Sequence, residues 1–200
     1  MKLVQCLGSS EVAFIAEELQ GDASHCVLHP SGSTLLCQLM LFASGEESTK
    51  TLVDELLSGD LAVLCCHKFG VEFAASVVSH GTRAQQALVV SALRCNLQRF
   101  ARHRFASRVL AEALLYCGEE ERFALASEIM SMPGAIVALA CHNFGVDVVR
   151  TLLQVPQASK QAMHFIEQGS RRIMKDKYGV HLLQELGLSG FSVSRAAGGA

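Results

Sequence analysis

A nine-residue pattern recurs along the chain, and its spacing restricts the fold more than any other feature of the sequence. The copies read "HPSGSTLLC", "HKFGVEFAA", "HRFASRVLA", "HNFGVDVVR" and "DKYGVHLLQ". The small residue that all copies share is Gly32, Gly70, Ala106, Gly145 or Gly179. Successive copies are therefore 38, 36, 39 and 34 residues apart. Such a period is typical of a solenoid, in which similar units of secondary structure stack side by side.

Each unit contains two predicted helices. The first is an amphipathic stretch with apolar residues at i, i+3, i+4 and i+7, found at 11–20, 48–57, 83–93, 120–130 and 159–168. Glycines that can cap such helices with a positive φ follow these stretches, at Gly21, Gly59, Gly134 and Gly169. A linker then leads to a second helix, which ends at Gly45, Gly81 and Gly118 in three units. The sequence therefore predicts an all-α fold.

The residues at the start of the second helix suggest two local roles. Ala106 replaces glycine in one unit, so the position selects a small side chain, to let a neighbouring helix approach, and not a left-handed backbone. A His or an Asp precedes it in every unit, as in His67 and Asp176. We expect these polar side chains to accept hydrogen bonds from free N–H groups of the helix N-terminus.

Two Cys-His pairs, Cys66–His67 and Cys141–His142, could instead indicate a metal site or a thiol catalyst. In equivalent positions the cysteine becomes Arg102 or Lys175. A metal site needs several ligands that converge at one place, so we interpret the pairs as parts of the repeat and expect no metal and no cofactor. The eight cysteines are spread through apolar segments, and we expect them to be reduced and mostly buried.

Sequence signatures of catalysis are missing. There is no Gly-x-Ser-x-Gly elbow, no phosphate-binding glycine loop and no His-Glu-x-x-His motif. His103 and Ser107 are one helical turn apart, but no third member of a triad is evident. We therefore expect the chain not to be an enzyme and to have no small-molecule substrate.

Charge and hydropathy restrict the binding partners and the cellular compartment that we expect. A formal net charge of -2 gives no general attraction to polyanions, so any nucleic-acid binding must depend on a local surface. The longest apolar stretches, 87–93 and 135–141, are far shorter than the roughly 20 residues that a membrane span needs. The first residues do not resemble a secretory signal. We expect a cytoplasmic protein, with the nucleus or nucleolus as alternatives, and no membrane partner.

The repeat resembles that of the Pumilio (PUF) family. The segment "GDLAVLCCHKFG" (59–70) and the aromatic-Gly-x-x-Val-Val signature carry the resemblance, which covers about 11–187. It implies a right-handed α-solenoid, or superhelix, of about five repeats in a domain spanning 1–187, with 1–10 as the remnant of a preceding repeat. The expected repeats are approximately 11–45, 46–81, 82–118, 119–156 and 157–187. Family members usually carry eight repeats, so we expect a partial array, and a disordered tail over 188–200.

The resemblance also implies a binding surface. In this family the second helices line a concave face that binds single-stranded RNA, one base per repeat, through two or three side chains of each second helix. The implied RNA-binding residues are Ser33, Thr34, Ser107, Arg108, Arg150, His181 and Gln184. The implied phosphate contacts are Lys68, Arg104 and Lys177.

Two acidic residues leave two functions open. Glu72 and Asp147 place carboxylates where RNA is expected, which is unfavourable beside phosphates. The first hypothesis is binding of single-stranded RNA, such as mRNA 3′ regions, in post-transcriptional regulation or RNA processing. The second is a protein–protein interaction solenoid that has lost sequence-specific RNA readout.

Overall fold

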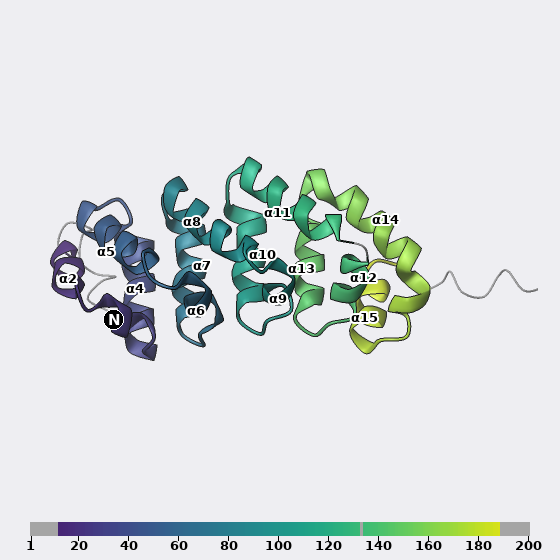
Figure 1. Cartoon of the computed structure of the whole chain (residues 1–200), viewed down its shortest axis with the longest axis horizontal. Coiled ribbons are helices and arrows are strands. Elements are labelled where there is room, and N and C mark those ends of the chain that lie inside the picture. The colour runs from purple at the N-terminus through teal and green to yellow at the C-terminus, as the bar shows by residue number, and fades with distance from the viewer. Residues whose placement is uncertain (1–11, 133, 189–200) are drawn as a thin grey trace, which may run out of the picture.

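The computed structural model describes residues 12–132 and 134–188, which form a row of stacked helices (Figure 1). The first helices of the units are α2 (Ala13–Leu19), α5 (Glu47–Leu57), α8 (Arg83–Arg94), α11 (Glu119–Ser131) and α14 (Pro156–Ile173). The second helices are α4 (Pro30–Ala43), α7 (Gly70–His80), α10 (Ala106–Tyr116), α13 (Gly145–Leu152) and α15 (Lys177–Glu185). The described ranges contain no strand, and the predicted all-α solenoid is confirmed.

The linkers contain further helices that the sequence pattern does not predict. They are α3 (Ala23–Val27), α6 (Leu61–Cys66), α9 (Leu97–Phe100) and α12 (Ala135–Ala140). With four to six residues each, they are too short to show a helical period. In the last unit the corresponding turns belong to α14, which continues to Ile173.

The small residue of the repeat lies against the backbone of the preceding linker segment. A Cβ added at Gly70 would lie 2.6 Å from the carbonyl oxygen of Leu64, and one added at Gly145 would lie 2.9 Å from that of Leu139. Gly32 and Gly179 approach the carbonyl group six residues upstream in the same way. None of these glycines has a positive φ. The close approach packs the second helix against its linker. It explains why this position accepts only a small residue, as predicted from the sequence.

Two of the predicted glycine caps are corrected by the structure. Gly21 and Gly134 have positive φ values of 90° and 70°, as predicted for residues that follow a helix. Gly59 does not have a positive φ; the C-cap of α5 is Ser58. Gly169 lies inside α14 and ends no helix. Its missing side chain leaves room for Val137 of α12, whose Cγ2 would collide with an added Cβ.

The core runs along the whole row because each second helix packs between its neighbours. α7 packs against α4 on one side and α10 on the other, and α10 packs against α13. Phe73 of α7 is the largest fully buried side chain, and Leu110 and Leu114 of α10 are equally inaccessible. This continuous burial holds the second helices side by side along the row (Figure 1).

Some predictions fall on residues outside the described part of the chain. They are the remnant of a repeat at 1–10 and almost all of the tail at 188–200. Among the described residues, no helix combines the length and apolar character that crossing a membrane requires.

Candidate nucleic-acid interface

The start of each second helix is held by a side-chain cap that repeats along the chain. The Nδ1 atom of His103 accepts hydrogen bonds from the N–H groups of Phe105 and Ala106, at 3.2 and 3.3 Å. His67 and His142 accept the equivalent pairs of bonds, and His29 accepts one from Ser31. Asp176 does the same through Oδ1, at 2.9 Å from Tyr178 N. The predicted capping role is therefore present in all of these units.

These caps require Nδ1 to be unprotonated, because a protonated nitrogen cannot accept a hydrogen bond. Burial lowers the pKa of His103, and the nearby Arg99 lowers it further. Burial and Arg102 likewise lower the pKa of His142, against an opposing effect of Asp176. For His103 and His142, the lowered pKa favours the neutral form that the cap geometry needs.

The cysteines beside these caps are not activated. Burial is the main cause of a raised pKa for both Cys66 and Cys141. Burial raises the pKa of Cys65 to about 12. A raised pKa disfavours the thiolate that nucleophilic catalysis and metal binding need. Together with the capping role of His67 and His142, this geometry makes the Cys-His pairs structural elements of the repeat.

The residues expected to stack on bases lie at one equivalent position of successive second helices. We call this set, Thr34, Glu72, Arg108, Asp147 and His181, the second-helix row. All are exposed except Thr34, which is partly buried. The Thr34 hydroxyl donates to the carbonyl of Pro30 in its own helix, at 2.8 Å. The row is thus a strip of mostly charged side chains.

The two serines expected to read bases are more enclosed than the resemblance implies. Ser33 is 2% exposed, and its hydroxyl donates to the carbonyl oxygen of Phe69 in the next unit, at 2.7 Å. Ser107 is 6% exposed. Val71 and Val146 occupy the same position in other units and are also buried. This position packs neighbouring units together, and at Ser33 the hydroxyl is already engaged.

Glu72 and Arg108 are neighbours on the second-helix row and form an ion pair between α7 and α10. Their side chains remain 48% and 53% exposed. The carboxylate therefore faces a cation from the next unit. A guanidinium group donates hydrogen bonds in its own plane, so its flat face stays available for stacking.

A second cluster of charges joins α13 to α15. Arg150 Nη1 lies 2.6 Å from Asp147 Oδ1, and its Nε lies 2.9 Å from Glu185 Oε2. Glu185 also contacts His181, with 2.8 Å between Oε1 and Nδ1. Hydrogen bonding to Glu185 raises the pKa of Arg150, and the same bond lowers the pKa of Glu185. Both expected readers, Arg150 and His181, are brought together here.

Glu185 is a member of this cluster that the sequence interpretation omits. It stands four residues after His181 and 35 after Arg150, one period away and opposite in charge. That spacing is a signal from which the pair can be predicted. Gln184, the remaining expected reader, is exposed, and its side-chain amide makes no hydrogen bond to another described residue.

The expected phosphate contacts sit over the aromatic rings of the repeat. Lys68 Nζ lies 5.1 Å from the ring centre of Phe69, and Lys177 Nζ lies 4.7 Å from that of Tyr178. Arg104 lies over Phe105 at 5.4 Å. All three are exposed and form no ion pair with another described residue. The rings thus hold one cation beside the start of three second helices.

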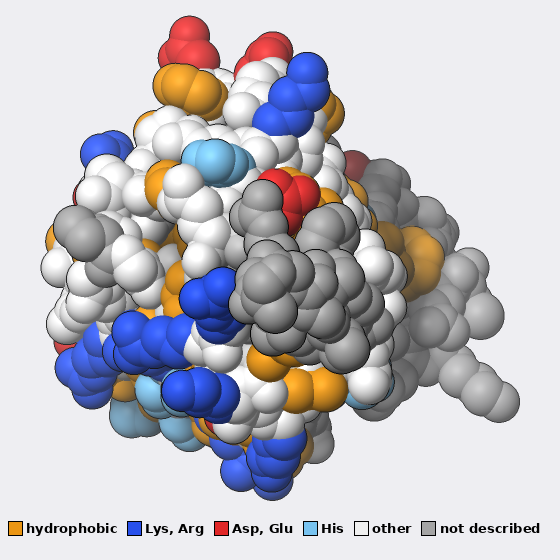
Figure 2. All heavy atoms as spheres, turned by 90° about the vertical axis from the view of Figure 1, so that its right-hand side faces the viewer, with side chains coloured by type: hydrophobic (Ala, Val, Ile, Leu, Met, Phe, Trp, Pro, Cys, Tyr) orange, Lys and Arg blue, Asp and Glu red, His pale blue; other side chains and the backbone are white. Residues whose placement is uncertain are grey.

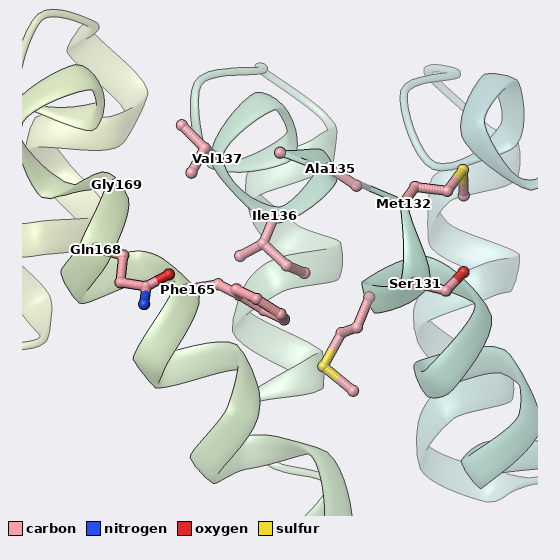
Figure 3. A pocket seen from close by; sticks show the side chains of 10 residues that line it. Ser131, Met132, Ala135, Ile136, Val137, Phe165, Gln168 and Gly169 are labelled. Carbon is pink, nitrogen blue, oxygen red and sulfur yellow. The ribbon is translucent and has the colours of Figure 1, made fainter.

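A cavity of about 430 Å³ lies away from the second-helix row, between α11, α12 and α14 (Figure 3). Its walls are mainly apolar and include Met130, and Ile136 and Phe165 point into it. Gln168 supplies a polar side chain at its edge. None of the sequence-predicted site residues lines it.

The sequence model of the Pumilio-family RNA binding repeat matches residues 96–130. This segment spans α9, α10 and α11, so it contains Ser107 and Arg108 and crosses the expected repeat boundary at 118. The resemblance to Pumilio repeats is confirmed. No curated protein matches the sequence significantly.

The fold is that of solved Pumilio-type domains. Over 90% of this chain, the structure of PUF-6 in complex with 5BE13 RNA is similar, with a TM-score of 0.74 and 20% identity. The domain of S. pombe Puf1 in complex with RNA gives 0.71 and 19% over 91%. The RNA-binding domain of yeast Puf5p bound to SMX2 RNA gives 0.68 and 15% over 86%. The chain spans 50%, 47% and 49% of the length of these structures, in that order.

Proposed function

We propose that the chain binds single-stranded RNA along its second helices, in post-transcriptional regulation of mRNA or in RNA processing. The observation that carries the proposal is the match of residues 96–130 to the Pumilio-family RNA binding repeat, because this segment includes α10 and the exposed Arg108. The likeness of the whole row to Pumilio-type domains that were solved with RNA supports it.

The exposed side chains of the row suit stacking between bases. Arg108 presents a guanidinium plane and His181 an imidazole ring, and both are group types on which unpaired bases stack. Each such stack is worth about 1–3 kcal/mol per base. In the proposed complex Arg108 keeps its in-plane bond to Glu72 while a base covers its face.

Hydrogen-bond readout is concentrated in the last units. Gln184 carries an exposed amide that can donate to and accept from a base edge. The Arg150 side chain is one third exposed. It can donate a hydrogen bond to a base if one of its N–H groups is released from Asp147 or Glu185. Ser33 and Ser107 are too enclosed to dominate recognition. We therefore propose that fewer bases are recognised than the chain has repeat units.

The alternative of a protein-interaction solenoid rests on Glu72 and Asp147. Glu72 is compensated by Arg108, which pairs with no other acid among the described residues. Asp147 shares Arg150 with Glu185, so one cation faces two carboxylates there. The pairing of Glu72 weakens the case for the alternative, and the α13–α15 cluster is the part of the surface that still favours it. We propose that the chain is a binding module and not an enzyme. We also propose that it works in the cytoplasm. The location of a fluorescent fusion protein would distinguish the cytoplasm from the nucleus and the nucleolus.

Fluorescence polarisation with a pool of random single-stranded RNA tests the proposal. Binding is expected at low salt, and Arg108→Ala and Gln184→Ala should each weaken it. Lys160→Ala, on the exposed side of α14, is the matched control and should bind like the wild type. No binding to any RNA in the pool, with protein recovered instead in a pull-down, would favour the alternative.

A further inference from the structure

Almost half of the cations of the chain lie in or next to the turns that lead into α7, α10 and α15, including residues of α9, the end of α14 and the start of α15. We call them the basic edge: Lys68, Arg99, Arg102, Arg104, Arg171, Arg172, Lys175 and Lys177. They are 8 of the 17 Lys and Arg residues, although the chain as a whole carries a net charge of -2. The positive charge of the protein is therefore local.

Neighbouring loops of this edge are close enough to influence one another. The charge of Arg99 lowers the pKa of Cys66 from the preceding unit, against the larger effect of burial. Arg102 acts on His142 of the following unit, and Arg172 acts on Cys141 of the preceding one. The turns before α7, α10, α13 and α15 thus lie along one side of the row, the lower side in Figure 1. The turn before α13 contributes no Lys or Arg.

The cations of the basic edge are exposed and lack acidic partners. All eight are exposed, and none forms an ion pair with another described residue. Segment 96–105 contains no Asp or Glu, and segment 170–178 contains only Asp176, which caps α15. Elsewhere Arg94, Arg108 and Arg150 pair with acids. Arg83 and Arg122 bind a glutamine side chain and a carbonyl group instead.

At the C-terminal end of the row, basic and acidic side chains gather on different parts of the surface. Figure 2 looks at the C-terminal end of the row and shows most Lys and Arg side chains over its lower left part, with Asp and Glu side chains chiefly at the top. Three glutamates occupy the first turn of α11, and Glu46 and Glu47 begin α5. The starts of α5 and α11 thus carry acidic groups. The basic edge, which includes the end of α14, carries cations that repel one another unless an anion lies between them.

We propose that the basic edge binds the phosphate backbone of RNA independently of sequence, beside the bases held by the second-helix row. This inference rests on the proposed function and extends it to Arg99, Arg102, Arg171, Arg172 and Lys175. An extended strand of phosphates supplies one negative charge per nucleotide, which matches a border with cations from several units. Arginine forks hold phosphate oxygens through two parallel N–H bonds.

The physical consequence is a division of labour. Phosphate contacts release counterions, so they give affinity that falls steeply with salt but no sequence preference. Contacts of Gln184 and Arg150 to base edges give sequence preference. Stacking on the second-helix row adds affinity that is tolerant of sequence. Since the net charge of the chain is negative, the basic edge is the part of the surface that can attract RNA at a distance.

The test compares two variants of equal charge change by fluorescence polarisation between 50 and 300 mM salt, on a random RNA pool and on poly(U). The edge variant is Arg99→Gln/Arg102→Gln/Arg172→Gln. The control variant is Lys50→Gln/Arg83→Gln/Lys160→Gln, with all substitutions on first helices. Circular dichroism and thermal melting first establish that both variants are folded.

The edge variant should weaken binding of both RNAs by roughly 10- to 100-fold at 0.1 M salt and reduce the salt slope by about 2, because each phosphate contact contributes about 0.7 to that slope for a single strand. The control variant should keep the wild-type slope. An edge variant with wild-type slope overturns the inference and leaves the proposed function intact. If that variant instead loses binding of poly-glutamate only, the edge serves an acidic protein segment. No RNA binding by the wild type refutes the proposed function itself.

Discussion

Arg108 of α10 is paired with Glu72 of α7, the residue at the same position one unit earlier. Both side chains are about half exposed, so the pair contributes about 1 kcal/mol or less to stability. The pair matters more for the binding surface than for stability. It neutralises an acid on the expected RNA path, and it fixes the guanidinium group of Arg108 beside the equivalent position of the preceding unit.

Removing that acid should strengthen RNA binding. Glu72→Gln is expected to tighten binding about two- to fivefold, because a solvated carboxylate beside phosphates costs about 1 kcal/mol or less. Fluorescence polarisation at low salt measures the change. Glu167→Gln, an exposed acid of α14, is the control and should have little effect. Weaker binding by Glu72→Gln would show that the ion pair, and not Arg108 alone, is what RNA requires.

The Arg150 cluster can be tested without RNA. Arg150 lowers the pKa of Glu185 by hydrogen bonding and by its charge. Arg150→Gln should therefore raise that pKa toward its usual range, which NMR titration of the Glu185 side-chain carboxyl carbon would follow. Lys160→Gln should leave the titration as in the wild type. An unmoved titration in Arg150→Gln would mean that the two side chains do not pair in solution.

The histidine caps predict a pH-dependent stability. The folded-state pKa values of His103 and His142 lie below the ordinary value of 6.5, so the unfolded chain takes up protons first as the pH falls. The contribution of these caps is therefore complete above 6.5, is lost as the pH drops below it, and levels off below the folded pKa values. Urea unfolding at a series of pH values measures the loss.

Replacing the histidine caps by aspartate tests whether the histidines cause this pH dependence, because an aspartate ordinarily titrates below this pH range. Asp176 caps α15 with the same geometry, so His103→Asp/His142→Asp should fold and should show a smaller loss of stability between about pH 7 and 5. His25→Asn, at an exposed histidine outside the caps, is the control. Identical pH profiles for all three proteins would exclude the caps as the source.

Close packing at the small position predicts a contrast between two substitutions. Gly70→Ala places a Cβ 2.6 Å from the carbonyl oxygen of Leu64 and should cost about 1–3 kcal/mol of unfolding free energy, as overpacking does. Ala106→Gly, at the same position of the next unit, should cost only about 0.5–1 kcal/mol. Chemical denaturation measures both. A harmless Gly70→Ala would contradict the size restriction.

The architecture could be predicted because one period repeats both its apolar pattern and its small residue. Helices α5, α8 and α11 begin and end within a few residues of the expected ranges. Linker helices such as α9 could not be predicted because its four residues make only about one turn. The prediction for Gly169 was wrong because a glycine that ends a helix and one that admits a side chain such as Val137 look alike in sequence.

The surface was harder to predict than the fold. The repeat pattern identifies its positions, but their burial depends on the crossing of adjacent units, which brings the Ser33 hydroxyl to the Phe69 carbonyl. Ion pairs such as Glu72–Arg108 and Arg150–Glu185 join residues one period apart. In a repeat protein, opposite charges one period apart in the sequence therefore predict a contact between adjacent units.

Photo-crosslinking with RNA that contains 4-thiouridine, followed by mass spectrometry of the linked peptides, tests the central claim most directly. We expect crosslinked residues on the exposed faces of α10 and α15, which carry Arg108, His181 and Gln184. Crosslinks confined to the first helices, such as α8 and α11, would contradict the account, as would their complete absence at low salt.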